Sequence, residues 1–248
     1  MKRLICLVAF AIVTMPSFAQ SARRTPNNLS FASDFQTVPV MANLTGAGGA
    51  VFRTYVALLN PTSSAFPVTV SLFDAAGVKR DAIIELAAGE QKTFDNFLST
   101  VFSFTGGGAV TFRSADSSKR FVVSAEVWTD DGRYGTSIPA LEFAGTDSPS
   151  FAPGVTVNSG TRTNVGCFNQ AGAPNTVTGT ILDATGHLTL GTVTLNLAAN
   201  GWSQTALSTV VSEGYVRFTP SDAAVCYAVV VDNFTNDGRF VSAAEFRP

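Results

Sequence analysis

The sequence predicts an all-β protein that contains two tandem antiparallel β-sandwich domains. Three observations predict this fold: an internal repeat, short segments in which apolar and polar residues alternate, and a composition rich in residues that form strands and turns. The repeat is explicit, because residues 53–77 return as residues 162–186 with a constant offset of 109 and nine identities in 25 aligned pairs. A repeat of this length indicates that one folding unit occurs twice.

Residues 1–19 are predicted to be a secretory signal peptide that is cleaved after Ala19. Lys2 and Arg3 precede an apolar run of about a dozen residues, and Ser17-Phe18-Ala19 has the small-x-small pattern of a cleavage site. The run is shorter than the roughly 20 apolar residues that a transmembrane helix needs. We therefore expect an exported protein without a membrane span, in the extracellular space, at the cell surface or in the periplasm.

The charge balance argues against nucleic acid as a partner. The sequence has 16 basic and 18 acidic residues, and removal of the signal peptide takes away only Lys2 and Arg3, which leaves a net charge of 14 − 18 = −4. Binding to phosphates needs clusters of Lys and Arg. The sequence contains no such cluster, and only 14% of its residues are charged.

The chain after the signal peptide divides into four predicted segments. A polar, flexible leader covers residues 20–35, and the first sandwich covers residues 36–143. Residues 144–150 form a linker rich in Gly, Thr, Ser and Pro, and the second sandwich covers residues 151–248. Each sandwich has the usual size of an independently folding domain.

Strand-like segments follow one another at short spacing in the first sandwich, at residues 37–42, 52–59, 67–73, 82–86, 109–113, 120–128 and 134–143. About seven short strands, with turns roughly every 8–12 residues, are typical of an immunoglobulin-like β-sandwich. The antibody pattern of two cysteines around a core Trp is missing, so the prediction concerns architecture alone. Short helical turns are expected at residues 94–101 and 205–211, where the alternation is lost.

Two four-residue segments are predicted hairpin turns in equivalent positions of the repeat. Asp74 to Gly77 and Asp183 to Gly186 begin with Asp, which can accept hydrogen bonds from nearby amides, and end with Gly, which can adopt positive φ. A second matching pair aligns residues 129–134 with residues 235–240 at an offset of 106. The sequence thus repeats the residues that form its turns.

Several of the repeated residues also carry a family resemblance. The pattern Arg-Thr-x-Val at residues 53–56 is followed by Asn60-Pro61, by the Asp-x-x-Gly turn, and late in the chain by Val231-Asp232-Asn233-Phe234-Thr235-Asn236-Asp237. In these features the chain resembles secreted bacterial proteins built from tandem immunoglobulin-like β-sandwich repeats. The resemblance implies this fold and export from the cell, and it implies no activity.

Cys167 and Cys226 remain after removal of the signal peptide, and both lie in the second repeat. Because an exported protein meets oxidising conditions, we expect a disulfide between them. The alternative is that both are buried thiols that pack as small hydrophobic side chains. The first repeat has Leu58 and, approximately, Arg120 at the equivalent positions, so it must fold without this bond.

Aromatic and acidic residues around the second pair of turns form the candidate ligand-binding site. It comprises Trp128, Asp131, Tyr134, Asp232, Phe234 and Asp237. Aromatic rings can stack on sugar rings while Asp and Asn accept hydrogen bonds from hydroxyl groups. Two alternatives remain. The rings could pack as cross-strand pairs, with Trp128 matching Phe234 and Tyr134 matching Phe240, or the clustered oxygens could bind Ca²⁺.

No set of residues indicates catalysis, a metal site or a cofactor. His187 is the single histidine and follows a turn, whereas a zinc site needs several His or Cys ligands. No G-x-S-x-G segment indicates a hydrolytic serine. Glu126, Glu142, Asp232 and Glu245 would be the candidates for a glycosidase pair, but Glu142 and Glu245 occupy repeated positions, which favours a structural role.

We therefore expect a non-enzymatic exported protein that acts by surface interaction, as an adhesion, cell-envelope or matrix component. Its partner would be an unknown protein or a glycan at the cell surface. The alternative is a carbohydrate-binding module, and a hydrolase of unrecognised type is less favoured.

Overall fold

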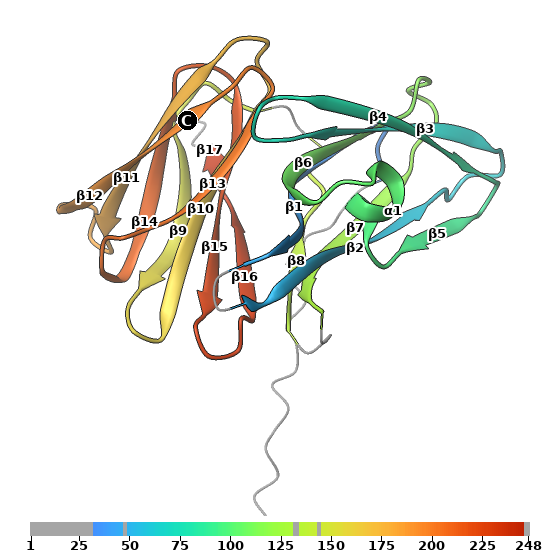
Figure 1. Cartoon of the computed structure of the whole chain (residues 1–248). Coiled ribbons are helices and arrows are strands. Elements are labelled where there is room, and N and C mark those ends of the chain that lie inside the picture. Colours follow the sequence, from blue (N-terminus) through green and yellow to red (C-terminus); the bar gives the residue numbers. More distant parts are fainter. Residues whose placement is uncertain (1–31, 47–48, 131–133, 143–144, 246–248) are drawn as a thin grey trace, which may run out of the picture.

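The computed structural model describes residues 32–46, 49–130, 134–142 and 145–245, and these residues form strands apart from one short helix and the connecting loops (Figure 1). Each pair of hydrogen-bonded strands is antiparallel. The all-β antiparallel fold predicted from the sequence is therefore confirmed. Within the described ranges, no helix is long and apolar enough to cross a membrane. The predicted signal peptide lies outside these ranges.

The first half of the chain folds into two layers of strands. One layer has the order β4-β3-β6-β1 and the other β5-β2-β7-β8, and the layers join at one corner, where the end of β1 pairs with the start of β2. The elements are β1 (Phe35–Thr45), β2 (Val51–Leu59), β3 (Phe66–Phe73), β4 (Lys79–Leu86), β5 (Gln91–Phe94), α1 (Phe97–Phe102), β6 (Gly106–Arg113), β7 (Val122–Thr129) and β8 (Gly135–Ile138).

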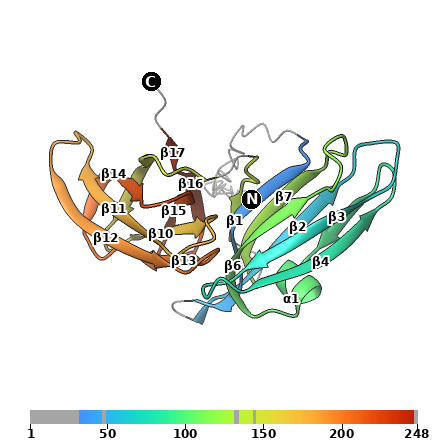
Figure 2. The ribbon, with the colours of Figure 1, turned by 90° about the horizontal axis from the view of Figure 1, so that it is seen from above.

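The second half repeats this arrangement. Its layers have the orders β12-β11-β14-β9-β17 and β13-β10-β15-β16, which match the first half in chain order apart from the added strand β17. Figure 2 shows the two halves side by side. The strands are β9 (Ser150–Val157), β10 (Thr161–Asn169), β11 (Asn175–Asp183), β12 (Thr189–Leu197), β13 (Trp202–Ala206), β14 (Val211–Pro220), β15 (Ala224–Asp232), β16 (Gly238–Ser242) and β17 (Ala244–Glu245).

The strand order limits the comparison with immunoglobulin domains to the layered antiparallel architecture. In a constant-type immunoglobulin domain the first strand lies beside the second strand. Here β1 lies beside β6 for most of its length, and β9 lies between β14 and β17.

Alternation along the strands produces an apolar core in each half. In β2, Thr54, Val56 and Leu58 are buried and the residues between them are partly exposed. The core of the first half also takes in Phe97 and Leu98 of α1. The side chain of the preceding Asn96 accepts a hydrogen bond from a first-turn amide of this helix, as an N-cap does.

One of the two predicted helical turns is confirmed and the other is wrong. The prediction at residues 94–101 corresponds to α1. The prediction at residues 205–211 fails, because β13 runs to Ala206 and residues 207–210 are not helical. In the strand registers Thr205 corresponds to Phe94, the last residue of β5, so residues 205 and 206 belong to the strand in the second half.

The repeated Asn residues make the same hydrogen bonds in both halves. Asn60 and Asn169 are fully buried. The side-chain amide of Asn60 donates to the carbonyl oxygens of Ser64 and Ala87, both at 2.8 Å. The amide of Asn169 donates to two carbonyl oxygens in the corresponding loops, at 2.8 and 2.7 Å. Because these buried groups find partners in the loops, they fix the chain where it leaves β2 and β10.

The two predicted Asp-Gly hairpin turns are also confirmed. Gly77 has a φ of 76° and Gly186 a φ of 73°. Asp74 Oδ1 accepts hydrogen bonds from two backbone amides of its turn, both at 3.0 Å. Burial acts to raise the pKa of Asp74, but hydrogen bonds from Arg80 and from these amides outweigh burial and hold the pKa below its ordinary value.

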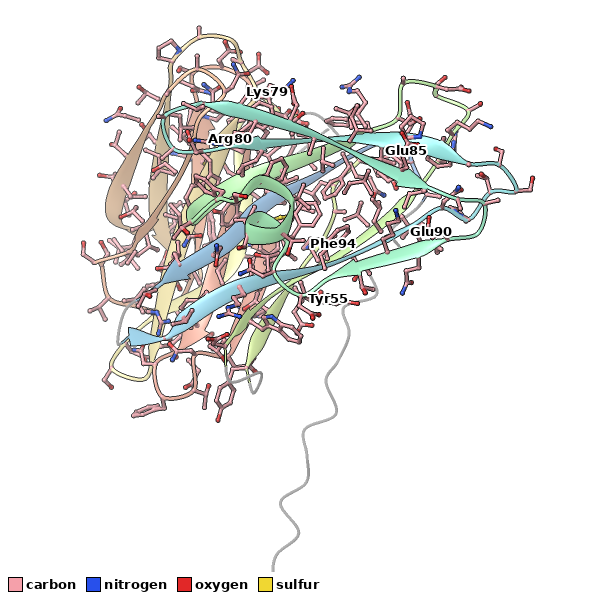
Figure 3. The ribbon with its side chains drawn as sticks, turned by 45° about the vertical axis from the view of Figure 1, so that its right-hand side comes forward. Tyr55, Lys79, Arg80, Glu85, Glu90 and Phe94 are labelled. Atoms are coloured by element: carbon pink, nitrogen blue, oxygen red, sulfur yellow. A yellow bond between two sulfur atoms is a disulfide. The ribbon has the colours of Figure 1, made fainter. Side chains whose placement is uncertain are left out.

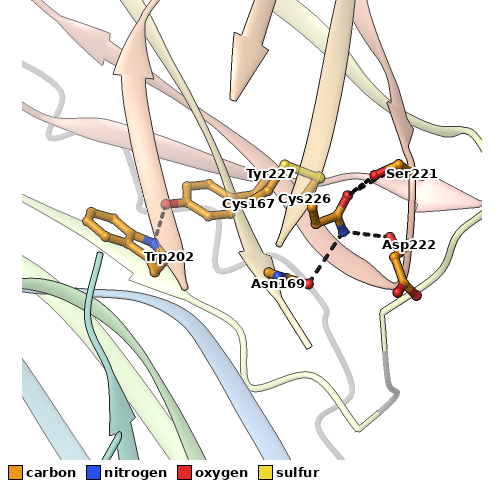
Figure 4. Close-up of a disulfide and its surroundings, with 8 residues drawn as sticks. Cys167, Asn169, Trp202, Ser221, Asp222, Cys226 and Tyr227 are labelled. Atoms are coloured by element: carbon orange, nitrogen blue, oxygen red, sulfur yellow. Dashed lines mark hydrogen bonds between the residues drawn. A yellow bond between two sulfur atoms is a disulfide. The ribbon is translucent and has the colours of Figure 1, made fainter. Parts of the chain in front are cut away.

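Cys167 and Cys226 form the predicted disulfide, which joins the neighbouring strands β10 and β15 (Figure 4). The two residues are directly opposite each other, with a Cα–Cα distance of 4.1 Å, and both are buried. The equivalent pair in the first half is Leu58 and Val123, which lie opposite each other in β2 and β7. The predicted equivalence with Arg120 is wrong, because Arg120 precedes β7.

Aromatic side chains join the two halves. The indole N–H of Trp202 donates to the hydroxyl of Tyr227 at 3.0 Å (Figure 4). That hydroxyl donates to Gln204 Oε1, also at 3.0 Å. Tyr227 is fully buried against the core of the first half, and burial raises the pKa of its hydroxyl. Phe73 of the first half packs on Phe168 of the second, with ring centroids 5.1 Å apart. The halves therefore share a packed interface.

The described part of the predicted linker is attached to the second half. Thr146 forms an isolated antiparallel bridge with Ala224, and the amide of Gly145 donates to the side-chain oxygen of Gln170. β9 then begins at Ser150.

Candidate functional site

The described ends of the β7–β8 connection and the turn between β15 and β16 meet at the junction of the two sandwiches and form the candidate site. The first connects β7 to β8, and the second connects β15 to β16. The amide of Gly135 donates to Asp237 Oδ1 at 3.3 Å, and Gly238 lies so close to Thr136 that a Cβ there would clash. An open depression of about 400 Å³ is lined by Gly49, Ala50, Val51, Thr129, Asp130, Tyr134, Phe234, Thr235 and Asn236.

Asp232 organises the second turn. Its Oδ1 accepts hydrogen bonds from the amides of Phe234 and Thr235, both at 2.8 Å. The amide of Thr235, and then that of Phe234, hold the pKa of Asp232 below its ordinary value because they stabilise the carboxylate. Asn236 has a φ of 65°, a left-handed conformation in which Asn is enriched.

Arg162 holds the same turn from the neighbouring strand β10. Its Nη1 donates to Asn233 Oδ1 at 3.0 Å, and its Nη2 donates to Asn236 Oδ1 at 2.9 Å. The side-chain amide of Asn233 donates in turn to the carbonyl oxygen of Ser159 at 3.1 Å. Side chains and backbone from three segments therefore fix the conformation of the turn.

Phe234 projects from this fixed turn into solvent. It is 84% exposed, the highest value among the large apolar side chains that the structure describes. Single exposed apolar residues are ordinary on protein surfaces. This one lines a depression that Tyr134 of the other half also lines. Aromatic rings from both halves therefore contribute to one open site.

Arg53 of β2 binds Asp130, the residue that follows β7. Arg53 Nε lies 2.9 Å from Asp130 Oδ1, and Arg53 Nη2 donates to Asp130 Oδ2 at 3.1 Å, which makes a two-pronged ion pair. In the strand registers this pair corresponds to Arg162 and Asn233 of the second half. At these positions the first half has an ion pair, whereas in the second half Arg162 donates to the neutral amide group of Asn233.

The structure brings four of the predicted site residues together. Tyr134 and Phe234 line the depression. Asp237 links the two turns through the amide of Gly135, and Asp232 shapes the turn that carries Phe234.

The other predicted aromatic residues lie elsewhere. Trp128 lies on β7, half-buried, with its ring centroid 5.7 Å from that of Tyr55, and it does not line the depression. Phe240 stacks on Tyr227 at the interface of the halves, with centroids 5.2 Å apart. Asp131 lies outside the described residues.

The strand registers correct the alignment of the two turns. Trp128 lies opposite Gly135, and Val231 lies opposite Gly238, which gives an offset of 103. Alignment of the similar residues 129–134 and 235–240 gives an offset of 106 instead. Trp128 and Phe234 therefore do not occupy equivalent positions. Trp128 and Phe240 each pack on a ring of the neighbouring strand, Tyr55 and Tyr227, as the packing alternative predicted, whereas Phe234 is exposed.

Comparisons with known proteins identify no family. No family model matches the chain, and no curated protein matches it. The resemblance to secreted tandem-sandwich proteins stays a prediction.

Sequence reasoning missed the two residues that bind these segments from the neighbouring strands, namely Arg53 and Arg162. A signal was present, because Arg opens the repeated segment in both copies. A partly exposed Arg at the same place in two strands has a role that apolar alternation does not explain, and here that role is to bind the turn beside it.

The described parts of the turns do not favour the Ca²⁺ alternative. Within the described ranges, no group of three or more His, Cys, Asp or Glu side chains lies close enough to hold a metal ion. Both carboxylate oxygens of Asp130 bind Arg53, and Asp232 Oδ1 accepts from two backbone amides.

Proposed function

We propose that this chain is a non-catalytic exported β-sandwich protein that acts by surface interaction, as an adhesion, cell-envelope or matrix component. The observation that carries the proposal is the placement of Phe234, an 84% exposed ring on a turn fixed by Asp232 and Arg162, beside a depression that both halves line. Rigid aromatic side chains supply contact area at a low cost in conformational entropy. A site of this kind suits recognition of a ligand that comes from outside the chain.

Export and a tandem immunoglobulin-like organisation are part of the proposal. The signal-peptide pattern of residues 1–19 and the Cys167–Cys226 disulfide support export, since disulfides persist mainly in oxidising compartments. The equal strand order of the two halves, and the equal hydrogen bonds of Asn60 and Asn169, support the tandem organisation.

A carbohydrate-binding module is the second candidate, and the mixture of groups around the ring favours it. Tyr134 and Phe234 offer aromatic surface, while Asn236 and Asp130 offer amide and carboxylate groups. The charge of Asp130 is compensated by Arg53. The described lining therefore suits a neutral sugar better than an ionic ligand.

Replacing Phe234 with Ala should weaken ligand binding by about 10- to 100-fold, because stacking and burial of the ring contribute roughly 1–3 kcal/mol. The melting temperature should stay nearly unchanged, since an exposed ring makes few native contacts. A glycan array and binding to extracted envelope material identify the ligand, and calorimetric titration of the parent and the variant measures the loss.

Ile83→Ala is the matched control, because Ile83 is 68% exposed on β4 and does not line the depression. It should leave binding unchanged. Trp128→Ala should lower the melting temperature, because it removes the ring that packs on Tyr55. Equal binding by the parent and Phe234→Ala would overturn the site. Envelope binding that is lost in Phe234→Ala, without a signal on the glycan array, would remove the carbohydrate candidate and keep the surface-interaction proposal.

A further inference from the structure

β12 is a free edge of the second half. It ends the sheet β12-β11-β14-β9-β17, and no strand in the described part of the chain pairs with its outer side. Residues 191–197 pair with β11 in a regular register, and the one irregularity is a bulge at Leu190 of β12, which precedes this segment. An edge strand presents N–H and C=O groups that can pair with a further strand.

Between Gly191 and Leu197, β12 lacks the charges, Pro residues and bulges that usually block an edge. None of its nine residues is charged and none is Pro. The equivalent edge of the first half, β4, carries Lys79, Arg80, Asp81 and Glu85 among eight residues (Figure 3). Lys79 and Asp81 form an ion pair at 3.0 Å. The chain thus has charged residues on one of its two equivalent edge strands, β4, and none on the other, β12.

The side chains of β12 alternate in a way that a second copy of the same strand would complete. Leu195 and Leu197 are 3% exposed and belong to the core, and Val193 packs against it. Thr192, Thr194 and Asn196 are exposed on the opposite face. Directly opposite residues of an antiparallel pair point to the same face. Two copies of β12 would therefore place apolar beside apolar side chains and polar beside polar ones.

A two-fold axis at Thr194 fits this pattern. Thr194 would lie opposite its own copy, Val193 opposite Leu195, and Thr192 opposite Asn196. In such a pair both strands have the same sequence, so a charged residue at the axis would lie opposite the identical charged residue of the second copy. The two charges would repel each other. Because β12 is uncharged along its whole length, it meets the condition that self-pairing imposes. This condition favours a second copy of the chain over a strand of another protein.

Two exposed apolar side chains lie at the start of β12. Leu188 is 58% exposed and Val210 is 73% exposed. Thr209, the neighbour of Val210, lies against Gly191, which places this segment beside the strand. In the two-fold arrangement the end of the second copy's β12 arrives at this place. Pairing would therefore cover apolar surface as well as the open edge.

We propose that two copies of this chain pair along β12, antiparallel about Thr194, and form a homodimer in which their two five-stranded sheets become continuous. The proposal is independent of the ligand site, because it uses neither turn of the junction.

The oligomeric state of the chain without residues 1–19 tests the proposal. Sedimentation equilibrium at micromolar concentration should show a dimer. Thr194→Lys should weaken dimerisation by about tenfold or more, because two like charges would lie directly opposite each other. Ile83→Lys is the matched control, since Ile83 pairs with Thr69 in β4 and β3 as Thr194 pairs with Thr178 in β12 and β11. The control should stay dimeric, and circular dichroism verifies that both variants are folded.

A cysteine at the axis gives a second readout. Thr194→Cys should form a disulfide-linked dimer on oxidation, whereas Ile83→Cys should not. A parent protein that is monomeric at every concentration would overturn the proposal. So would a dimer that survives Thr194→Lys, an equal loss in Ile83→Lys, or a dimeric Thr194→Cys variant that does not cross-link.

Discussion

Replacing Cys167 with Leu and Cys226 with Val should lower the free energy of unfolding by about 4 kcal/mol. The two cysteines are 59 residues apart in sequence, and the entropy of closing a loop of that length corresponds to roughly 4 kcal/mol at 25 °C. Leu and Val are the residues that the first half has at the equivalent positions, Leu58 and Val123. The substitution therefore keeps an apolar contact between the strands and removes the covalent bond. Urea denaturation followed by circular dichroism measures the change.

The corresponding double Ala variant separates the covalent contribution from packing. It should be less stable than the Leu and Val variant by about 1–3 kcal/mol, because it also leaves space in the core. If the Leu and Val variant proves as stable as the parent, the disulfide adds nothing beyond the packing of two apolar side chains.

Gly77→Val should lower the free energy of unfolding by about 3 kcal/mol or more, because it combines backbone strain with overpacking. A φ of 76° is strongly disfavoured for a β-branched residue. The backbone strain of Val in this turn accounts for about 1–3 kcal/mol of the loss in free energy of unfolding. In addition, a Cβ at Gly77 would lie 2.0 Å from the carbonyl oxygen of Ala199 in the second half. The substitution should therefore also weaken the contact between the halves.

Gly89→Val provides the comparison, since Gly89 has a φ of 68° and open space where a Cβ would lie. It should show the loss due to the backbone conformation alone. Urea denaturation of both variants measures the difference, and small-angle X-ray scattering reports whether the halves of Gly77→Val separate. Equal losses of stability and unchanged scattering would contradict a contribution from the Ala199 contact.

Features that depend on neighbours in sequence could be predicted. The alternation of Val193, Leu195 and Leu197 with polar residues identified a half-buried strand, because each side chain reports only the face on which it lies. The Asp74 to Gly77 turn was predictable for a similar reason. Its carboxylate binds amides of the same turn, and its Gly supplies the positive φ.

The equivalence of the two junction turns could not be predicted, because sequence similarity and strand pairing differ by three residues. Residues 129–134 resemble residues 235–240, but pairing places Val123 opposite Leu58 and Cys226 opposite Cys167. The pairing of these buried residues sets the register. A short turn motif can recur three residues away from the equivalent position without changing this strand register.

The site itself depends on contacts between distant segments. Tyr134 and Phe234 are 100 residues apart in sequence, and they line one depression because the halves pack through Trp202 and Tyr227. No local pattern encodes that packing. The exposure of Phe234 could not be predicted either, since a Phe in a strand-rich sequence is usually a core residue.

The disulfide also gives the two halves different responses to mechanical tension. A force that pulls on the ends of the second half cannot extend the chain between Cys167 and Cys226, because the bond carries the load directly. That segment would otherwise contribute about 200 Å of extended length, at roughly 3.4 Å per residue. The first half contains no cysteine and can extend fully once it unfolds. Under tension the first half can therefore extend over its whole length, whereas the second half can extend only outside the segment that the disulfide closes.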